Sequence, residues 1–248
     1  MNNVLNKSVI SHIKTCKIFA FFAGIFYSLW ILTYFVTPID ILNPTLSPDF
    51  FDIVSTQKFF FILNNVSFIF ASFCMIGIVS TFNFLGRQEN YGILNFISLI
   101  GTIGFSFGIL SKTSYLFYVL KLIPIFDLLS PTMQEIITTI GIQQFDYGVM
   151  SFGATGLWFF IVSYLALNNK NIPKQLSITS LLIGFFSISL VIFGFIYPSH
   201  ISQSNSALLP AIDLANICFV SYIFLLNVWV FLEAFYLHSF DLDTLDHT

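Results

Sequence analysis

The sequence predicts an all-α fold: a polytopic membrane helix bundle with six transmembrane helices and one short amphipathic helix on the outer side. The first observation is that Asp, Glu, Lys and Arg are absent from six stretches of at least 19 residues, which are 18–39, 59–86, 90–111, 147–169, 175–212 and 214–232. A helix needs roughly 20 mostly apolar residues to cross a bilayer. The second observation is composition, since 56% of the residues are hydrophobic and 8% are charged, against roughly 25% charged in soluble domains.

The expected spans cover 18–36, 59–83, 91–111, 148–168, 177–197 and 210–236. Unpaired backbone polar groups are not tolerated in hydrocarbon, so each span should be a helix. The apolar run that begins at Ile18 is longer than the core of about 7–15 residues in a cleavable signal peptide, and we expect it to be retained as the first span. Short connections should make spans two and three, and spans four and five, antiparallel neighbours. A single membrane domain then accounts for residues 1–248.

The two long outer connections contain further helix-forming patterns. Ser47-Pro48-Asp49 offers an N-cap, a proline and an early acid, and it predicts a short helix leading into the second span. Ser130-Pro131 begins another, whose apolar residues recur at a helical spacing: Met133, Ile136, Ile137 and Ile140. This pattern predicts an amphipathic helix that lies on the outer surface or caps the bundle. A seventh span across 113–126 is the alternative, and its short length, Lys121 and Pro124 argue against it.

The basic residues of the loops predict the orientation, because Lys and Arg are enriched on the cytoplasmic side of membrane proteins. With the N-terminus inside, six basic residues fall on the inner side and three on the outer side. The inner set is Lys7, Lys14, Lys17, Arg87, Lys170 and Lys174, and the outer set is Lys58, Lys112 and Lys121. An even number of spans then places both termini in the cytoplasm.

Span six contains a polar stripe that suggests a ligand site. Five residues fall within about 60° of one another at 100° per residue: Asp213, Asn216, Val220, Asn227 and His238. Intramembrane polar residues tend to face the bundle interior or a wet cavity. Span two offers a partner face through Asn64, Ser67, Ala71 and Cys74. We predict ligand binding by Asn64, Ser67, Asp213, Asn216 and Asn227, and the alternative is that the asparagines only join helices by hydrogen bonds.

Other charged residues point to no reaction. Glu233 lies on the opposite side of span six, and we expect it to reach the inner interface or to pair with a loop lysine. A proton-coupling role is the alternative for this residue. Acids and a histidine could converge on the outer face and bind a metal or transfer protons: Asp40, Asp49, Asp52, Asp127, Glu135, Asp146 and His200. Their spacing matches no catalytic motif, and the three cysteines form no CxxC pair. We therefore predict no catalytic residue, metal or cofactor, and the few basic residues exclude nucleic acid as a partner.

The chain resembles a bacterial membrane family known as domain of unknown function 4386. The residues that carry the resemblance are Ala23-Gly24-x-x-Tyr27, Asp52-Ile53-Val54, Tyr147-Gly148, Phe152-Gly153, Trp158, Tyr164-Leu165, Ile172-Pro173-Lys174 and Leu181-Leu182-Ile183-Gly184. The family often has His-Glu where this chain has Phe145-Asp146, so a role that rests on that histidine does not transfer. The resemblance implies a polytopic protein of a bacterial inner membrane, and it implies no activity.

Three functions remain open from the sequence. The leading hypothesis is a non-enzymatic binding, accessory or scaffold bundle that holds a lipid or a small apolar molecule between spans two and six. Its expected partners are membrane lipids, together with a second copy or another membrane protein. The second hypothesis is a small-molecule or ion transporter or channel, although no inverted repeat or broken-helix pair is evident. The third is an intramembrane enzyme that uses the outer acids and His200.

Overall fold

The computed structural model of the protein describes residues 2–36, 50–88, 92–137, 149–167, 173–196 and 209–243, and these residues form helices and turns without any strand. The six long helices are α1 (Asn2–Val36), α4 (Lys58–Gln88), α5 (Gly92–Leu122), α7 (Val149–Leu167), α8 (Lys174–Ile196) and α9 (Leu209–Asp243). Each of the six contains a segment long and apolar enough to cross a membrane. The predicted all-α class with six membrane-spanning helices is therefore confirmed.

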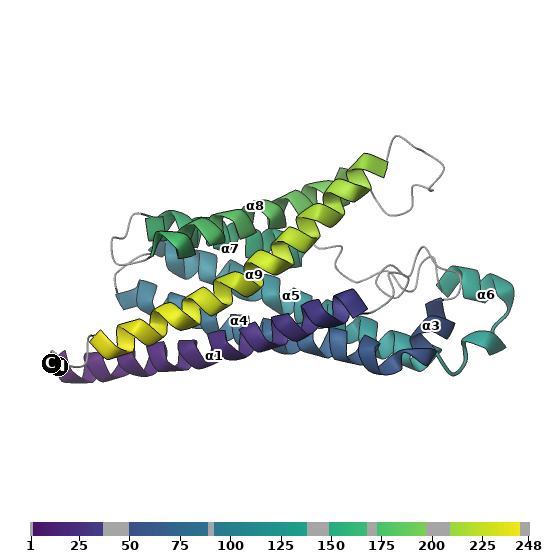
Figure 1. The fold of residues 1–248 in the computed structure, drawn as a ribbon, viewed down its shortest axis with the longest axis horizontal. Coiled ribbons are helices and arrows are strands. Elements are labelled where there is room, and N and C mark those ends of the chain that lie inside the picture. The colour runs from purple at the N-terminus through teal and green to yellow at the C-terminus, as the bar shows by residue number, and fades with distance from the viewer. Residues whose placement is uncertain are drawn as a thin grey trace.

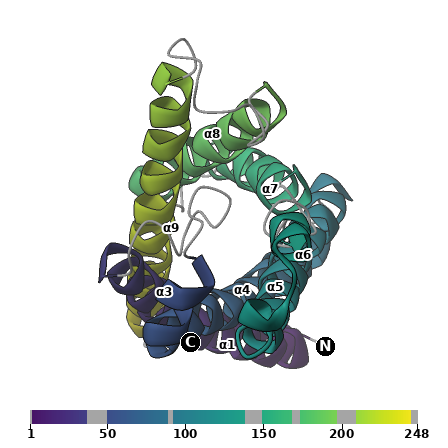
Figure 2. The same cartoon turned by 90° about the vertical axis from the view of Figure 1, so that its right-hand side faces the viewer.

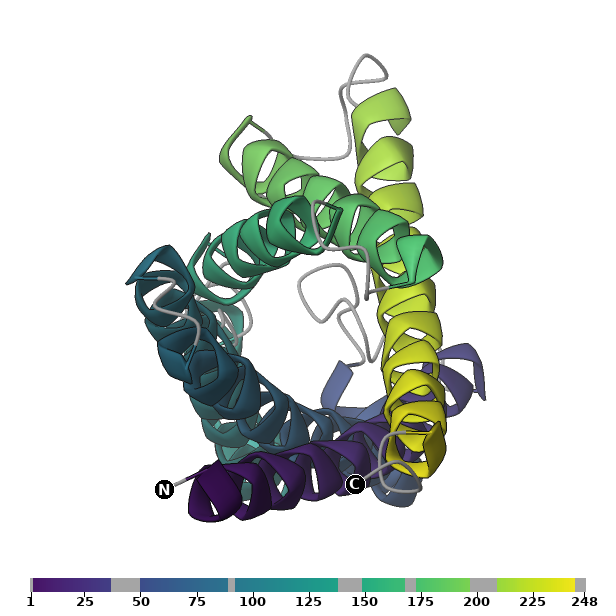
Figure 3. The ribbon, with the colours of Figure 1, turned by 90° about the vertical axis from the view of Figure 1, so that its left-hand side faces the viewer.

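The six long helices form a closed ring. Each helix packs against two neighbours in the cyclic order α1, α4, α5, α7, α8, α9 and back to α1. Figures 2 and 3, which view the molecule from its two ends, show this ring. The predicted pairing of spans two and three and of spans four and five is confirmed by the α4–α5 and α7–α8 contacts. The beginning of α1 and the end of α9 lie at the same end of the molecule (Figure 1).

Large aromatic side chains fill the inner side of the ring. Trp158 of α7 and Trp229 of α9 are fully buried, and their ring centroids lie 6.1 Å apart in an edge-to-face arrangement. Phe159 contacts both indoles, with centroid distances of 4.8 Å to Trp158 and 5.2 Å to Trp229. Edge-to-face contacts of this kind stabilise aromatic pairs beyond the burial of their area. In a membrane, lipid tails solvate an apolar helix as well as a neighbouring helix does. Close packing therefore becomes a main source of stability for the bundle.

Glycines determine how closely α5 and α8 approach α7. A Cβ atom on Gly104 of α5 would lie 2.9 Å from the backbone nitrogen of Thr155. A Cβ on Gly184 of α8 would lie 3.0 Å from the carbonyl oxygen of Gly156. Small residues at helix contacts let backbones approach in membranes. Two hydrogen bonds reinforce the α7–α8 contact, since Ser163 Oγ donates to Ser177 O and Ser187 Oγ donates to Phe152 O, both at 2.7 Å.

The third long helix extends beyond the predicted span. We expected it to end at residue 111, before Lys112, but α5 continues to Leu122. The Nζ atom of Lys112 lies 5.7 Å from the centroid of the Tyr115 ring and 6.0 Å from that of Phe68. Aromatic faces attract a cation at this distance, which explains why the charge does not end the helix. Residues 113–122 are therefore neither a loop nor a separate span.

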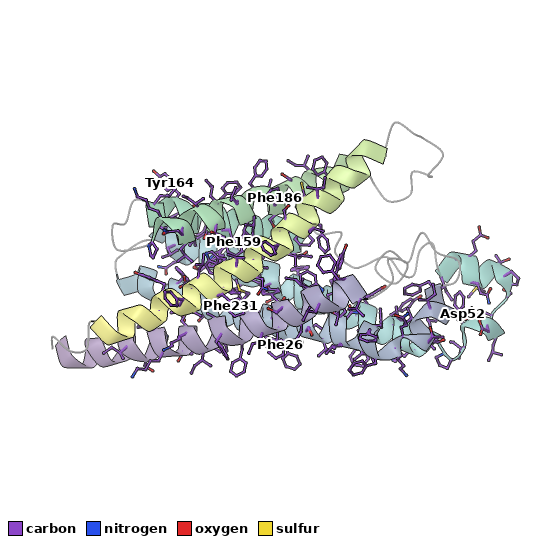
Figure 4. The ribbon with its side chains drawn as sticks, in the orientation of Figure 1. Phe26, Asp52, Phe159, Tyr164, Phe186 and Phe231 are labelled. Atoms are coloured by element: carbon purple, nitrogen blue, oxygen red, sulfur yellow. The ribbon has the colours of Figure 1, made fainter. Side chains whose placement is uncertain are left out.

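The extended end of α5 belongs to a second hydrophobic cluster at the end of the molecule opposite the start of α1. At about 1.5 Å per residue, the 31 residues of α5 span about 46 Å, well beyond the roughly 30 Å of a bilayer core. The cluster joins α5 to α4, to the short helix α3 (Phe50–Thr56) and to the 3₁₀ turn Phe126–Leu128. Its buried members are Phe50, Phe51, Val54, Phe61, Tyr115, Leu116, Val119, Leu122 and Phe126. Figure 4 labels Asp52 in this region, on α3.

Both short helices predicted in the connections are present. The helix predicted after Ser47-Pro48-Asp49 is α3, and those three residues lie outside the described part of the chain. The second is α6 (Pro131–Ile136), where the Ser130 hydroxyl accepts a hydrogen bond from Met133 N at 3.4 Å. Gln134 donates through Nε2 to Phe126 O at 2.9 Å and fastens α6 to the 3₁₀ turn. Met133 and Ile136 are exposed, and Ile140 lies beyond the described residues.

We expect Gly104→Ala to lower the thermal unfolding midpoint of the purified protein, because its Cβ would meet the Thr155 backbone, which cannot yield as a side chain can. Overpacking of this kind costs about 1–3 kcal/mol. The matched control is Gly92→Ala in the same helix, where a Cβ meets nothing within 4 Å. Melting in detergent should show a lower midpoint for the first variant and an equal or higher one for the second. Equal midpoints for the two variants would contradict close α5–α7 contact at Gly104.

Candidate functional site

The buried face of α9 differs from the polar stripe chosen from the sequence. The buried residues of α9 follow one helical face: Cys218, Tyr222, Ile223, Leu226, Trp229, Val230, Glu233 and Leu237. Val220 of the predicted stripe is exposed, and Asn227 is half-buried. We predicted from polarity that the asparagine side of α9 faces inward, and this was wrong. The buried side of the helix instead contains its bulky aromatic residues, Tyr222 and Trp229.

Glu233 is the buried acid of that face. Its side chain is 3% exposed, and its Oε2 atom has no hydrogen-bond partner. The expectation that it reaches the interface was wrong. Cys16 of α1 lies within electrostatic range of the carboxyl group and beside the Thr81 side chain of α4. One turn earlier on α9, the Trp229 Nε1 atom is also buried without a partner. Ionisable groups inside a membrane are costly, and they often mark ligand or ion sites.

The asparagines predicted on spans two and six both bind α1 rather than each other. Asn64 donates through Nδ2 to Thr33 Oγ1 at 3.0 Å and to Trp30 O at 3.4 Å. Asn227 donates through Nδ2 to Ser28 Oγ at 3.0 Å. In the ring, α1 lies between α4 and α9, and each of the two amides is bonded to α1. These are the interhelical hydrogen bonds of the alternative hypothesis.

The structure describes the side chains of only some of the other residues that we predicted to bind a ligand. Ser67 of α4 is buried, together with Ala71 and Cys74 on the same face. Asp213 and Asn216 belong to the first turns of α9, and their side chains lie outside the described part of the structure, as does that of His238. The ligand role of the five predicted residues stays a prediction. Among those whose side chains are described, Asn64 and Asn227 bond to a common neighbour, α1.

A groove opens on the outer surface of the ring between α1 and α9. It has a volume of about 1000 Å³ and ten lining residues, which are Lys14, Lys17, Ile18, Phe21, Phe22, Val228, Phe231, Leu232, Ala234 and Phe235. Gly24 helps to shape it, since a Cβ there would lie 2.8 Å from the Phe231 ring. Phe231 lies on α9 where this helix runs beside α1 (Figure 4). Eight of the ten residues are apolar, and the other two are lysines at one end of the groove.

The outer acids do not form a described site. Asp52, Asp127 and Glu135 are exposed, and Asp40, Asp49, Asp146 and His200 lie outside the described residues. Within the described ranges, no group of three His, Cys, Asp or Glu side chains has the geometry to hold a metal ion. The hypothesis of an enzyme therefore gains no support from the three acids whose positions are known.

Neither the α1–α9 groove nor the burial of Glu233 was predicted from the sequence. The groove needs α1 and α9 side by side, and nothing local indicates that the first and sixth spans are neighbours. Its two lysines were noticed, but only as indicators of orientation. Glu233 was visible as a charge near the end of a span, yet its burial depends on which face of α9 meets the ring.

Six helices that are long and apolar enough to cross a membrane define the chain as a multi-pass α-helical membrane protein. No protein-family model, curated protein or solved structure matches it. The resemblance to the family of domain of unknown function 4386 accordingly stays a prediction.

We expect Glu233→Met to raise the unfolding midpoint by several degrees, because it replaces a buried, unpartnered polar atom with an apolar group of similar length. Such an atom costs about 1–3 kcal/mol when it is left unsatisfied. The matched control is Glu233→Gln, which keeps a polar end and should bring no such gain. A lower midpoint for Glu233→Met than for Glu233→Gln would mean that the carboxyl group is satisfied in the folded protein.

Proposed function

We propose that the protein is a non-enzymatic binding or accessory protein of a bacterial inner membrane, and that it holds the acyl chain of a membrane lipid in the α1–α9 groove. The observation that carries the proposal is the groove itself, which is lined almost wholly by apolar side chains within two membrane-spanning segments. Its volume of about 1000 Å³ lies at the upper end of the range for small-molecule sites, roughly 300–1000 Å³.

The surroundings of the groove favour a lipid over a soluble ligand. Ile18, Phe21 and Phe235 are exposed on the outside of the ring, where hydrocarbon covers a membrane-spanning helix. A lipid chain can enter from the side without crossing water. The aromatic walls are stiff, with few rotatable bonds, so holding a chain between them costs little side-chain entropy.

The orientation belongs to the same proposal. The excess of lysine and arginine on the side of the N-terminus supports cytoplasmic termini. The lysine end of the groove lies towards the start of α1 and the end of α9. With this orientation, the groove opens to the cytoplasmic leaflet.

We expect Ile18→Trp to reduce the phospholipid that remains bound during purification, because the larger side chain fills the groove. Native mass spectrometry of the detergent-released protein measures the loss, and about a tenfold weaker affinity corresponds to about 1.4 kcal/mol. The matched control is Leu99→Trp on α5, since Leu99 is 58% exposed and Ile18 is 56% exposed, but Leu99 does not line the groove. Equal lipid retention in both variants would reject the groove as the binding site.

A second function, the transport of a proton or another cation, is favoured by Glu233 alone. Carboxyl groups inside membrane proteins commonly serve as relay sites for protons in pumps and transporters. Glu233 faces the interior of a closed ring, and its Oε2 atom has no partner. The surrounding packing of Trp158, Phe159 and Trp229 makes lipid binding the better supported of the two functions, because these rings fill the interior near the acid.

Transport predicts that the native protein in liposomes dissipates an imposed proton gradient and that Glu233→Gln does not. The amide has nearly the same size as the acid, but it cannot exchange a proton. A fluorescent pH indicator inside the vesicles reports the flux, and Asp127→Asn serves as a control at an exposed acid. A native protein that leaks no faster than protein-free vesicles would remove this candidate.

A further inference from the structure

The α1–α9 groove has an uneven distribution of charge. Its two cations, Lys14 and Lys17, are three residues apart on α1 and therefore lie on one face of that helix. None of the ten lining residues is acidic. Lys14 is exposed and Lys17 is half-buried, so the cations lie at the margin of the apolar surface.

The apolar part of the groove extends from the lysines towards the middle of the membrane. On α1 the order along the chain is Lys14, Lys17, Ile18, Phe21 and Phe22. On α9, which runs the other way, Phe235 lies nearest the lysine end and Val228 lies farthest from it. Their separation of seven positions corresponds to about 10 Å of helix. The groove thus has a charged end near the membrane surface and an apolar floor deeper in.

This arrangement matches the chemistry of one class of molecule. A phospholipid has its phosphate at the membrane surface and its acyl chains below it. Lysines at the ends of membrane helices extend their ammonium groups to that depth. Basic residues close to a membrane surface attract anionic lipids, each by roughly fivefold in affinity.

A second copy of the chain is a poorer occupant of the same surface. Two copies in one membrane share an orientation, so a twofold contact through this groove would bring both pairs of lysines to the same depth. Like charges opposite one another in an interface are strongly unfavourable. An anionic lipid meets the same lysines with opposite charge.

We propose that the α1–α9 groove selects anionic phospholipids, with Lys14 and Lys17 binding the headgroup phosphate and the apolar floor holding one acyl chain. This inference rests on the proposed lipid-binding function and adds the headgroup class to it. The selection comes from two ammonium groups at one end of an apolar groove whose ten lining residues include no Asp or Glu. Zwitterionic phospholipids occupy the same groove more weakly, because their own cation opposes the lysines.

The test compares phosphatidylglycerol and phosphatidylcholine with identical acyl chains, titrated onto the delipidated full-length protein and measured by native mass spectrometry. We expect the native protein to bind phosphatidylglycerol about tenfold more tightly. The Lys14→Gln, Lys17→Gln double variant should lose that preference and retain its affinity for phosphatidylcholine. Lys14→Gln alone should lose part of it. Lys14→Arg with Lys17→Arg should preserve the preference, and the single variant Lys14→Gln keeps the test decisive if the double glutamine variant does not fold.

Controls at distant cations complete the experiment. Lys58→Gln and Lys121→Gln alter exposed lysines that do not line the groove, and they should leave the preference unchanged. Equal affinity of the native protein for the two lipids, or an unchanged preference in the double glutamine variant, would overturn headgroup selection. Either outcome leaves the groove proposal intact, because that proposal fails only if Ile18→Trp retains as much phospholipid as Leu99→Trp.

Discussion

The ring depends on the position of α1 between α4 and α9. This helix contacts both neighbours, and each contact is fastened by an asparagine. Amide hydrogen bonds between membrane helices contribute about 0.6–2 kcal/mol each. They also fix rotation, because a helix turned by one residue would leave the amide without a partner in hydrocarbon. With α1 fixed in this way, α9 must present its aromatic face inward, and the ring closes around it.

Two kinds of polar group in the ring differ in what they can do. Asn64, Asn227, Ser163 and Ser187 lie at helix contacts, where each has a partner on the neighbouring helix. Glu233 lies on the inner face, and its Oε2 has none. The first kind holds the architecture together, and the second is where an interior function would reside. The groove belongs to neither kind, because it is an apolar surface on the outside of the ring.

The sequence predicted the spans well, because the absence of charge over 19 or more residues is a direct consequence of the hydrocarbon core. It failed at Lys112, where we expected the helix to end and where it continues, with the rings of Tyr115 and Phe68 beside the charge. It also failed on α9, because two asparagines form a stripe more conspicuous than a single glutamate. The interior face of a helix is set by its neighbours, and the neighbours of α9 are distant in the sequence. The groove was not predicted for the same reason, because its ten residues come from two helices that are far apart in the sequence.

Ring closure has a consequence for the order of events during synthesis. Ser28 and Asn227 are 199 residues apart, so α1 must remain in the membrane without its final neighbour while the intervening helices are made. The groove does not exist until α9 has been inserted, because one of its walls is absent. Bound lipid would thus report that the ring is complete, and a chain that stalls before α9 would lack the site while retaining five of its spans.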